Sequence, residues 1–156
     1  MKKKFIILVF AFCSAMFFAQ SKKNAQVTNL YKNYISLKNA LATDSSAKAS
    51  ISATDFVKTV SVINSKIIAE GNLAIMKNSA KVIANSDNIK VQRKNFENIS
   101  NQMIALAKLF KLTDNSVYIQ YCPMADAGWL SNESKIINPY YGSSMLSCGK
   151  VQQEIK

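Results

Sequence analysis

The stretch VTNLYKNYISLKNALA, residues 27–42, decides the fold class because its apolar side chains recur every three or four positions. This spacing gathers them on one face of an α-helix. The face consists of Val27, Leu30, Tyr31, Tyr34, Leu37 and Leu41. Similar spacing continues over residues 26–112, which contain no proline and a single glycine, so we predict that this whole region is helical.

Turn and cap residues divide this region into four predicted helices. The first covers residues 27–42, and Thr43–Ser46 then has the composition of a turn and a helix N-cap. A second helix is expected to run to about Ala69 and to be ended by Gly71. The third carries Leu73, Met76, Ala80 and Ile83, and the fourth, after a Ser86-Asp87 cap, carries Phe96, Ile99, Met103, Leu106 and Phe110. Four amphipathic helices with short connections predict an all-α, up-and-down four-helix bundle over residues 26–112.

The composition changes at residue 113. Residues 113–156 contain both prolines, three of the four glycines, the only tryptophan and four of the six tyrosines. Prolines, glycines and aromatic residues in this density favour turns and short extended pieces over long helices. We therefore expect a compact irregular segment with one or two short strands. It is expected to belong to the same single domain, residues 21–156, as the bundle.

The N-terminus has the composition of a secretory signal peptide. Met1–Lys4 is basic, Phe5–Phe18 is apolar but shorter than a membrane-spanning helix, and small or polar residues follow. We predict a signal peptide over residues 1–20, cleaved near Ala19 or Gln20, with export to the periplasm and no stable membrane span after cleavage. Cys13 would be discarded with this leader.

The predicted mature chain is basic and contains no histidine. Loss of the leader leaves 17 basic and nine acidic residues, a net charge of +8. The lysines are scattered along the sequence, whereas nucleic-acid binding needs a clustered basic patch, so no nucleic-acid partner is expected. The absence of histidine excludes Ser-His-Asp and Cys-His catalytic sites and His-containing zinc sites. No other catalytic constellation is present, and we predict that the chain is not an enzyme.

The most distinctive side chains are two cysteines and two methionines in the C-terminal segment. Tyr118–Tyr121 favours a β-strand that ends near Cys122, and in extended backbone Cys122 and Met124 would point to the same side. Met145 and Cys148 would share one face of a helical turn. Thiolate and thioether sulfurs are soft ligands that favour Cu(I) over the harder divalent ions. The four side chains therefore predict a Cu(I) site.

The same two cysteines also fit a disulfide, because an exported protein meets an oxidising compartment. A Cys122–Cys148 bond would close a loop of about 26 residues and contribute about 3 kcal/mol by the loop-entropy estimate. Met124 and Met145 would then be packing residues. Spacing alone does not decide between a metal site and a disulfide, so both hypotheses stay open.

Four short motifs run through the C-terminal segment: QYCPMA at 120–125, WLS at 129–131, NPYYG at 138–142, and ML-x-CG at 145–149. This set resembles a family of short periplasmic domains of Gram-negative bacteria whose activity is unassigned. Its members occur alone after a signal peptide or appended to periplasmic adaptor subunits of heavy-metal efflux pumps. The resemblance implies a helical bundle with a Cys/Met motif that works alongside copper and related metals. Relatives often place a histidine in the helical region, and this chain has none.

These observations predict a periplasmic Cu(I) buffer or carrier linked to metal homeostasis. The predicted metal ligands are Cys122, Met124, Met145 and Cys148. A metal-efflux or metal-maturation protein would be the partner. The alternative is a non-enzymatic interaction module that a Cys122–Cys148 disulfide stabilises.

Overall fold

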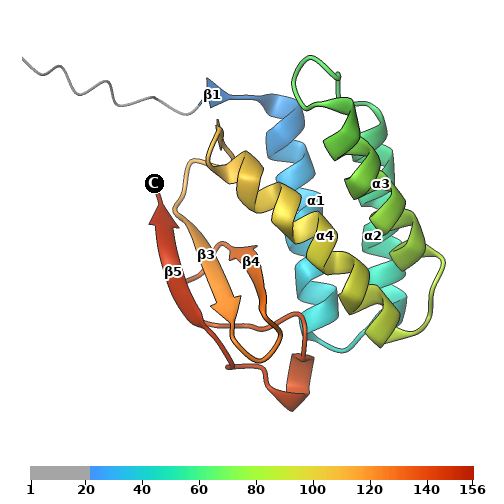
Figure 1. Ribbon diagram of the computed structural model, residues 1–156, viewed down its shortest axis with the longest axis vertical. Helices are drawn as coiled ribbons and strands as arrows, with labels where there is room; N and C mark the ends of the chain where they lie inside the picture. Colours follow the sequence, from blue (N-terminus) through green and yellow to red (C-terminus); the bar gives the residue numbers. More distant parts are fainter. Residues whose placement is uncertain (1–21) are drawn as a thin grey trace, which may run out of the picture.

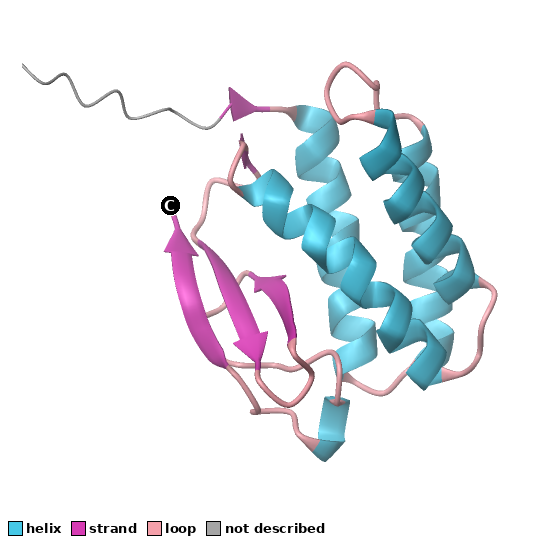
Figure 2. Cartoon of the chain, viewed as in Figure 1, coloured by secondary structure: helices cyan, strands magenta, loops and turns pink. Residues whose placement is uncertain are grey.

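The computed structural model describes residues 22–156, so the predicted signal peptide and Cys13 lie outside the described residues. Four helices occupy one side of the molecule: α1 (Ala25–Ala42), α2 (Ser46–Ser61), α3 (Glu70–Ala84) and α4 (Ile89–Ala107). A small sheet occupies the other side, next to α4 (Figure 1). Figure 2 shows this separation of helices from strands directly. The fold is therefore mostly helical, with two layers.

The helices form where the sequence supplies both a cap and an apolar stripe. The side chains of Asn24, Ser45 and Asn88 accept hydrogen bonds from backbone N–H groups in the first turns of α1, α2 and α4. The stripes face inward and build one core. Its largest fully buried members on the helices are Tyr34, Phe56, Phe96, Leu30, Leu37, Leu41, Met76, Ile83, Ile99 and Met103. The predicted helical bundle is confirmed.

Two helix boundaries differ from the prediction. Helix α2 ends at Ser61 rather than near Ala69, and residues 62–69 form turns in which the carbonyl of Asn64 accepts the N–H groups of Ile67 and Ile68. The apolar spacing continued past the helix end because buried side chains in these turns still cover the core. Gly71 does not end α2, since it is the second residue of α3.

The C-terminal segment contains more strand than predicted, which corrects the all-α class. Strands β3 (Val117–Cys122), β4 (Ala127–Ser131) and β5 (Lys150–Ile155) form an antiparallel sheet in the order β4-β3-β5. The sequence pattern missed β5 because its side chains are mostly exposed and lack a buried face. Two short strands, β1 (Lys22–Lys23) and β2 (Phe110–Lys111), pair in parallel, and a 3-10 turn, η1 (Gly142–Ser144), precedes β5.

The sheet packs one face on α4. The Tyr34 hydroxyl accepts the N–H of Leu130 at 3.0 Å and is within 2.5 Å of the Ser100 hydroxyl, so α1, α4 and β4 meet at one buried group. Trp129, the neighbour of Leu130, points to the opposite face because side chains alternate along a strand. There its ring lies edge-on to Tyr140, with 6.0 Å between centroids. This second face is covered by the loop that leads from β4 to β5.

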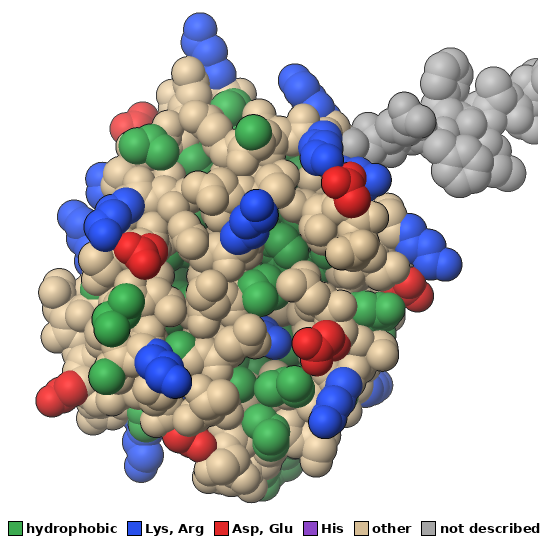
Figure 3. Space-filling view, turned by 180° about the vertical axis from the view of Figure 1, so that it is seen from behind, with side chains coloured by type: hydrophobic (Ala, Val, Ile, Leu, Met, Phe, Trp, Pro, Cys, Tyr) green, Lys and Arg blue, Asp and Glu red, His purple; other side chains and the backbone are tan. Residues whose placement is uncertain are grey.

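The face of the molecule that lies behind the view of Figure 1 carries scattered charges. Figure 3 shows Lys and Arg side chains spread over that face, with acidic side chains between them and no continuous basic patch. Within residues 22–156, no helix combines the length and the apolar composition needed to cross a bilayer.

Candidate functional site: the Cys122–Cys148 thiol pair

The sheet brings the two cysteines together. Cys122 is the last residue of β3, and Cys148 lies two residues before β5. Since β3 and β5 run antiparallel with Tyr121 opposite Lys150, the chain before β5 returns to the end of β3. The two Sγ atoms lie 2.9 Å apart, within hydrogen-bond distance, with no bond drawn between them.

The two thiols have different environments. Cys122 is fully buried, whereas Cys148 is half-buried. Burial raises the pKa of Cys122. Hydrogen bonds from Cys148, from the backbone N–H groups of Ala125 and Met124, and from Asn138 lower it by more than burial raises it, so the pKa of Cys122 lies below its ordinary value. The hydrogen bond to Cys122 and burial raise the pKa of Cys148. The first proton lost from the pair therefore leaves a thiolate at Cys122, which Cys148 stabilises as a donor.

Met124 and Met145 lie in the two turns beside the thiol pair. The extended-backbone argument for Met124 is wrong, because β3 ends at Cys122 and the chain turns at Pro123–Asp126. The Met124 side chain is 63% exposed and that of Met145 is 40% exposed. Met145 belongs to a turn in which its carbonyl accepts the N–H of Cys148 at 3.0 Å. The structure thus brings the two thiols into contact and leaves both thioethers at the surface near them.

A buried asparagine holds the loop over the sheet. The Asn138 side-chain N–H donates to the Cys148 carbonyl at 2.9 Å, and its oxygen accepts the N–H groups of Tyr140 and Tyr141. Tyr141 in turn donates its hydroxyl to the Met124 carbonyl at 2.9 Å. The sequence shows Asn138 only as the first residue of the NPYYG motif, and no pattern indicated that its amide would fix a cysteine.

Two polar atoms near the pair have no hydrogen-bond partner among the described residues. These are Nε1 of Trp129 and Oε1 of Gln120, whose residues are opposite each other in the register of β3 and β4. The amide nitrogen of Gln120 is fully engaged with the carbonyls of residues 133, 134 and 135. Both side chains are fully buried. Trp129 and Gln120 lie on the same face of the sheet as Cys122. The surroundings of the thiol pair on this face are therefore mainly apolar and include these two polar atoms.

A charged clip fastens the loop to the bundle. Arg93 on α4 donates to the carbonyls of Leu41 and Pro139 and pairs with Asp44 at 2.5 Å. Asp44 also accepts the N–H of Ser143 at 2.9 Å. Hydrogen bonds from Ser143 and Arg93 lower the pKa of Asp44 to about 2. The loop that carries Cys148 is therefore anchored at its η1 end by an ionised carboxylate.

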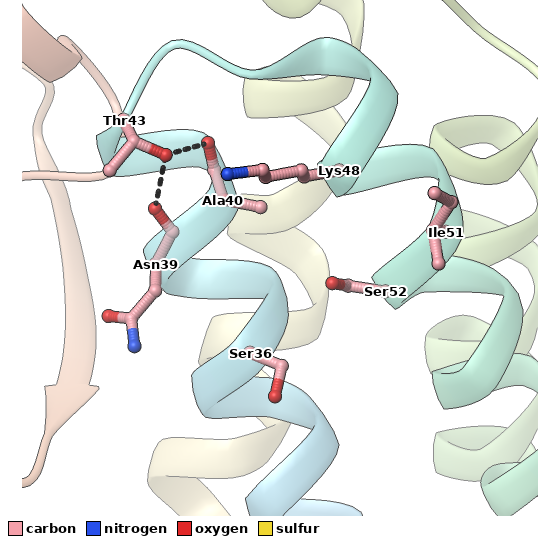
Figure 4. A pocket seen from close by; sticks show the side chains of 7 residues that line it. All are labelled: Ser36, Asn39, Ala40, Thr43, Lys48, Ile51 and Ser52. Carbon is pink, nitrogen blue, oxygen red and sulfur yellow. Dashed lines mark hydrogen bonds between the residues drawn. The ribbon is translucent and has the colours of Figure 1, made fainter.

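The larger hollows of the surface lie away from the sulfurs or contain none. A groove of about 370 Å³ between α1 and α2 has both polar side chains and the apolar Ala40 and Ile51 in its wall. Its Thr43 hydroxyl donates to the carbonyls of Asn39 and Ala40 (Figure 4). A cleft of about 420 Å³ between α4 and the loop has Lys90, Lys94 and Glu97 in its wall. Neither hollow has sulfur in its wall, so neither suits a soft metal ion.

The donor set of the pair determines which metals fit. Among residues 22–156 there is no group of three or more His, Cys, Asp or Glu side chains placed to hold an ion. A structural zinc site, which takes four such ligands, does not fit. Two thiols with methionines near them fit a soft ion of low coordination number, since thioether and thiolate sulfurs select Cu(I).

Comparison with known proteins identifies the bundle. Residues 30–115, more than half of the chain, match the family described as "Protein of unknown function (DUF3347)". No curated protein and no solved structure matches the chain. The matched range covers most of the four helices and ends before β3, so the thiol pair lies beyond it.

Proposed function

The chain belongs to the DUF3347 family, and on that premise we propose that it is an exported, periplasmic protein that binds Cu(I) as a buffer or carrier. The proposed ligands are the thiolates of Cys122 and Cys148, with the thioethers of Met124 and Met145 completing the coordination. Cu(I) is cargo in this proposal: the protein binds it and passes it on.

The single observation that carries the proposal is the contact between the two thiols. Their Sγ atoms lie 2.9 Å apart although 26 positions separate them in the chain. The pair is hydrogen-bonded in a way that favours one thiolate. Thiolate is the form that binds metal, and a soft ligand pair with a low-pKa member favours a soft cation.

Binding requires the pair to open slightly. With metal–thiolate bonds of about 2.3 Å, two sulfurs on a four-coordinate tetrahedral ion lie about 3.8 Å apart, so the thiols must separate by about 1 Å. Cys122 is held in the hydrogen-bonded ladder of β3, whereas Cys148 lies in a turn outside any helix or strand. We expect Cys148 to make this movement, with Met124 and Met145 swinging inward from exposed positions.

The proposed partner is a metal-efflux or metal-maturation protein. The resemblance of the C-terminal motifs to domains appended to efflux adaptor subunits supports this choice. Met124, Met145 and Leu146 are all exposed next to the pair. A partner that receives Cu(I) by ligand exchange needs such an approach to the sulfurs, and these side chains leave one.

A Cu(I) titration under anaerobic conditions against a competing chelator tests the proposal. We expect reduced protein to bind one Cu(I) per chain and the Cys122→Ser/Cys148→Ser variant to lose that binding. Trp129 is the only tryptophan of the chain and lies on the same sheet face as Cys122, so its fluorescence reports binding at this place. Unchanged affinity in the double variant would overturn the proposal.

Methionine substitutions test the thioether ligands separately. Met124→Ala/Met145→Ala should weaken Cu(I) binding about 10-fold or more, the loss that even indirect ligand partners can cause. Met76→Leu is the matched control, because Met76 is buried in the bundle core and should leave the affinity unchanged. Affinity should also rise with pH, since binding displaces thiol protons.

The second candidate is a non-enzymatic interaction module in which the two cysteines form a fixed disulfide. The observation in its favour is the 2.9 Å separation of the two Sγ atoms, which exceeds the length of a disulfide bond by only about 1 Å. Intact mass with and without alkylation separates the two candidates. A quantitative disulfide that resists reduction in protein taken from the periplasm would favour the module, and two free thiols would favour the metal site.

A further inference from the structure

The two sulfurs differ in how a second molecule can reach them. Cys122 is fully buried at the end of β3, opposite the buried Ala127. Cys148 is half-buried and follows the exposed residues 145–147. An attacking group must approach along the S–S axis, and only Cys148 lies toward solvent. The asymmetry is built into the fold, because β3 fixes one cysteine inside the sheet and a turn carries the other.

We propose that Cys148 is a thiol–disulfide exchange site, at which an external dithiol or disulfide reacts, and that Cys122 is its internal partner. The pair would then be a reversible switch with a fixed direction of attack. Only one part of this inference rests on the proposed function, namely that the switch controls metal binding. The direction of attack holds for the sulfur pair with or without metal.

The oxidation step balances with an external disulfide as the oxidant. Cys148 passes its proton to the neighbouring Cys122 thiolate and then attacks one sulfur of that disulfide. A mixed disulfide forms on Cys148, and the released external thiolate takes the proton from Cys122, which is a thiolate again. The Cys122 thiolate then attacks Cys148 Sγ, 2.9 Å away, forms the internal disulfide and releases the second external thiol. The cysteines lose two electrons and two protons in total, and the external disulfide becomes two thiols.

The reduction step uses a dithiol in the reverse order. One thiolate of the dithiol attacks Cys148 Sγ, the internal S–S bond breaks, and Cys122 leaves as a thiolate. The backbone N–H groups of Met124 and Ala125 donate hydrogen bonds to that sulfur and stabilise its negative charge. The second thiol of the dithiol then resolves the mixed disulfide. Because the disulfide has no thiolate to offer, the oxidised protein cannot hold Cu(I), and the external redox pair decides whether metal binds.

The first experiment needs no cysteine substitution in the described region. Reduced, folded full-length protein carrying Cys13→Ser is treated with a limiting alkylating reagent, and each cysteine is quantified by peptide mass spectrometry. We expect Cys148 to react about 100-fold faster than Cys122, because alkylation of Cys122 requires local opening of the sheet. In urea the two rates should become equal. Equal rates in the folded protein, or faster alkylation of Cys122, would overturn the inference.

The second experiment follows the exchange itself with oxidised glutathione as the probe, in the same Cys13→Ser background. Cys122→Ser should accumulate the mixed disulfide on Cys148, because nothing resolves it. Cys148→Ser should stay unmodified while folded, and the protein with both cysteines should go directly to the internal disulfide. Accumulation of a mixed disulfide on Cys122 in the Cys148→Ser variant contradicts the assigned order.

These assays separate the inference from the proposed function. They contain no metal, so an absence of Cu(I) binding leaves the alkylation and exchange results unchanged. If Cu(I) binds, the oxidised protein should show no binding and should recover it after treatment with dithiothreitol. Cu(I) binding of equal affinity in the oxidised protein would remove the control of metal binding from the inference, whatever the direction of attack.

Discussion

The helical bundle and the C-terminal segment are held together by different kinds of contact. The bundle buries aliphatic and aromatic side chains at helical spacing, and its larger core members make few polar contacts. The C-terminal segment relies on individual polar groups, such as Asn138 on Cys148 and the Tyr140 hydroxyl on the Gly128 carbonyl at 2.7 Å. Cores of the first kind tolerate exchange among residues of similar volume, whereas a hydrogen bond to one particular atom does not.

The bundle therefore acts as the scaffold, and the C-terminal segment carries the reactive groups. The match to the DUF3347 family covers residues 30–115, the region whose core tolerates exchange among residues of similar volume. The thiol pair belongs to the half in which single atoms are fixed. Substitutions in the bundle should therefore change stability alone, whereas substitutions in the segment should change stability and the reactivity of the thiols together.

Truncation of Trp129 should produce the largest effect. Trp129 is fully buried and contacts Tyr140, which lies 5.7 Å from Phe96 of α4 between ring centroids. Trp129→Ala should lower the free energy of unfolding by about 3–5 kcal/mol, measured by urea denaturation with helical circular dichroism as the signal. It should also expose Cys122 to alkylation in the folded protein.

The bundle provides a matched control for that substitution. Phe56 on α2 is equally buried, and Phe56→Ala should cost a similar 3–5 kcal/mol, roughly, while the alkylation rates of both cysteines stay unchanged in the folded state. If Trp129→Ala leaves the helical transition where it is, the bundle unfolds independently of the segment, and the aromatic contacts through Tyr140 do not couple the two regions.

Gly142→Ala should come next. Gly142 has φ +55°, and a Cβ there would collide with the Asp44 carboxylate and the Arg93 guanidinium. A non-glycine residue in this strained position costs about 2 kcal/mol. Because the substitution displaces η1, we expect faster alkylation of Cys122 as well, quantified by the same peptide assay. A stability loss with unchanged thiol reactivity would mean that the clip does not position the Cys148 loop.

The bundle followed from the sequence because helical periodicity is a local property. Apolar residues recur every three or four positions around Leu30 on α1, Phe56 on α2 and Phe96 on α4, and this spacing indicates which side of each helix is buried. The strand β3 was also expected from its β-prone residues. Strand β5 was missed, since its register comes from pairing with β3 and its own side chains carry no buried face.

The candidate site was predicted only in part, for the same physical reason. Cysteine chemistry and the predicted export indicated Cys122 and Cys148 as a disulfide or metal pair, and the contact of their sulfurs agrees with either interpretation. The role of Asn138, the anchoring by Arg93 and Asp44, and the unpaired polar atoms of Trp129 and Gln120 arise from contacts between distant parts of the chain. No local spacing encodes such contacts.

Asp44→Asn should have a smaller effect with a distinctive pH dependence. The pKa of Asp44 is lowered from 3.8 to about 2 in the folded protein, so its stabilisation is complete above pH 3.8 and is lost as the pH falls through about 2. Its side chain is 37% exposed, and solvent screening reduces the expected contribution to about 1 kcal/mol. Urea denaturation should show this difference between wild type and variant near neutral pH and a much smaller one near pH 2. A constant difference at both pH values would show that the carboxylate charge is not what holds the loop.

Gly71→Ala should have the smallest effect and the opposite sign. Gly71 lies in the first turn of α3, and a Cβ there meets no atom within 4 Å. Alanine loses less conformational entropy than glycine when a helix forms, so the free energy of unfolding should rise by about 0.5 kcal/mol. The same chemical change, Gly→Ala, therefore stabilises the bundle and destabilises the C-terminal segment at Gly142. The thiol alkylation rates should be identical to those of the wild type, because a change confined to the scaffold has no route to the sulfurs other than global unfolding. A measurable change in Cys148 reactivity from this position would mean that the two regions are coupled more tightly than their contacts imply.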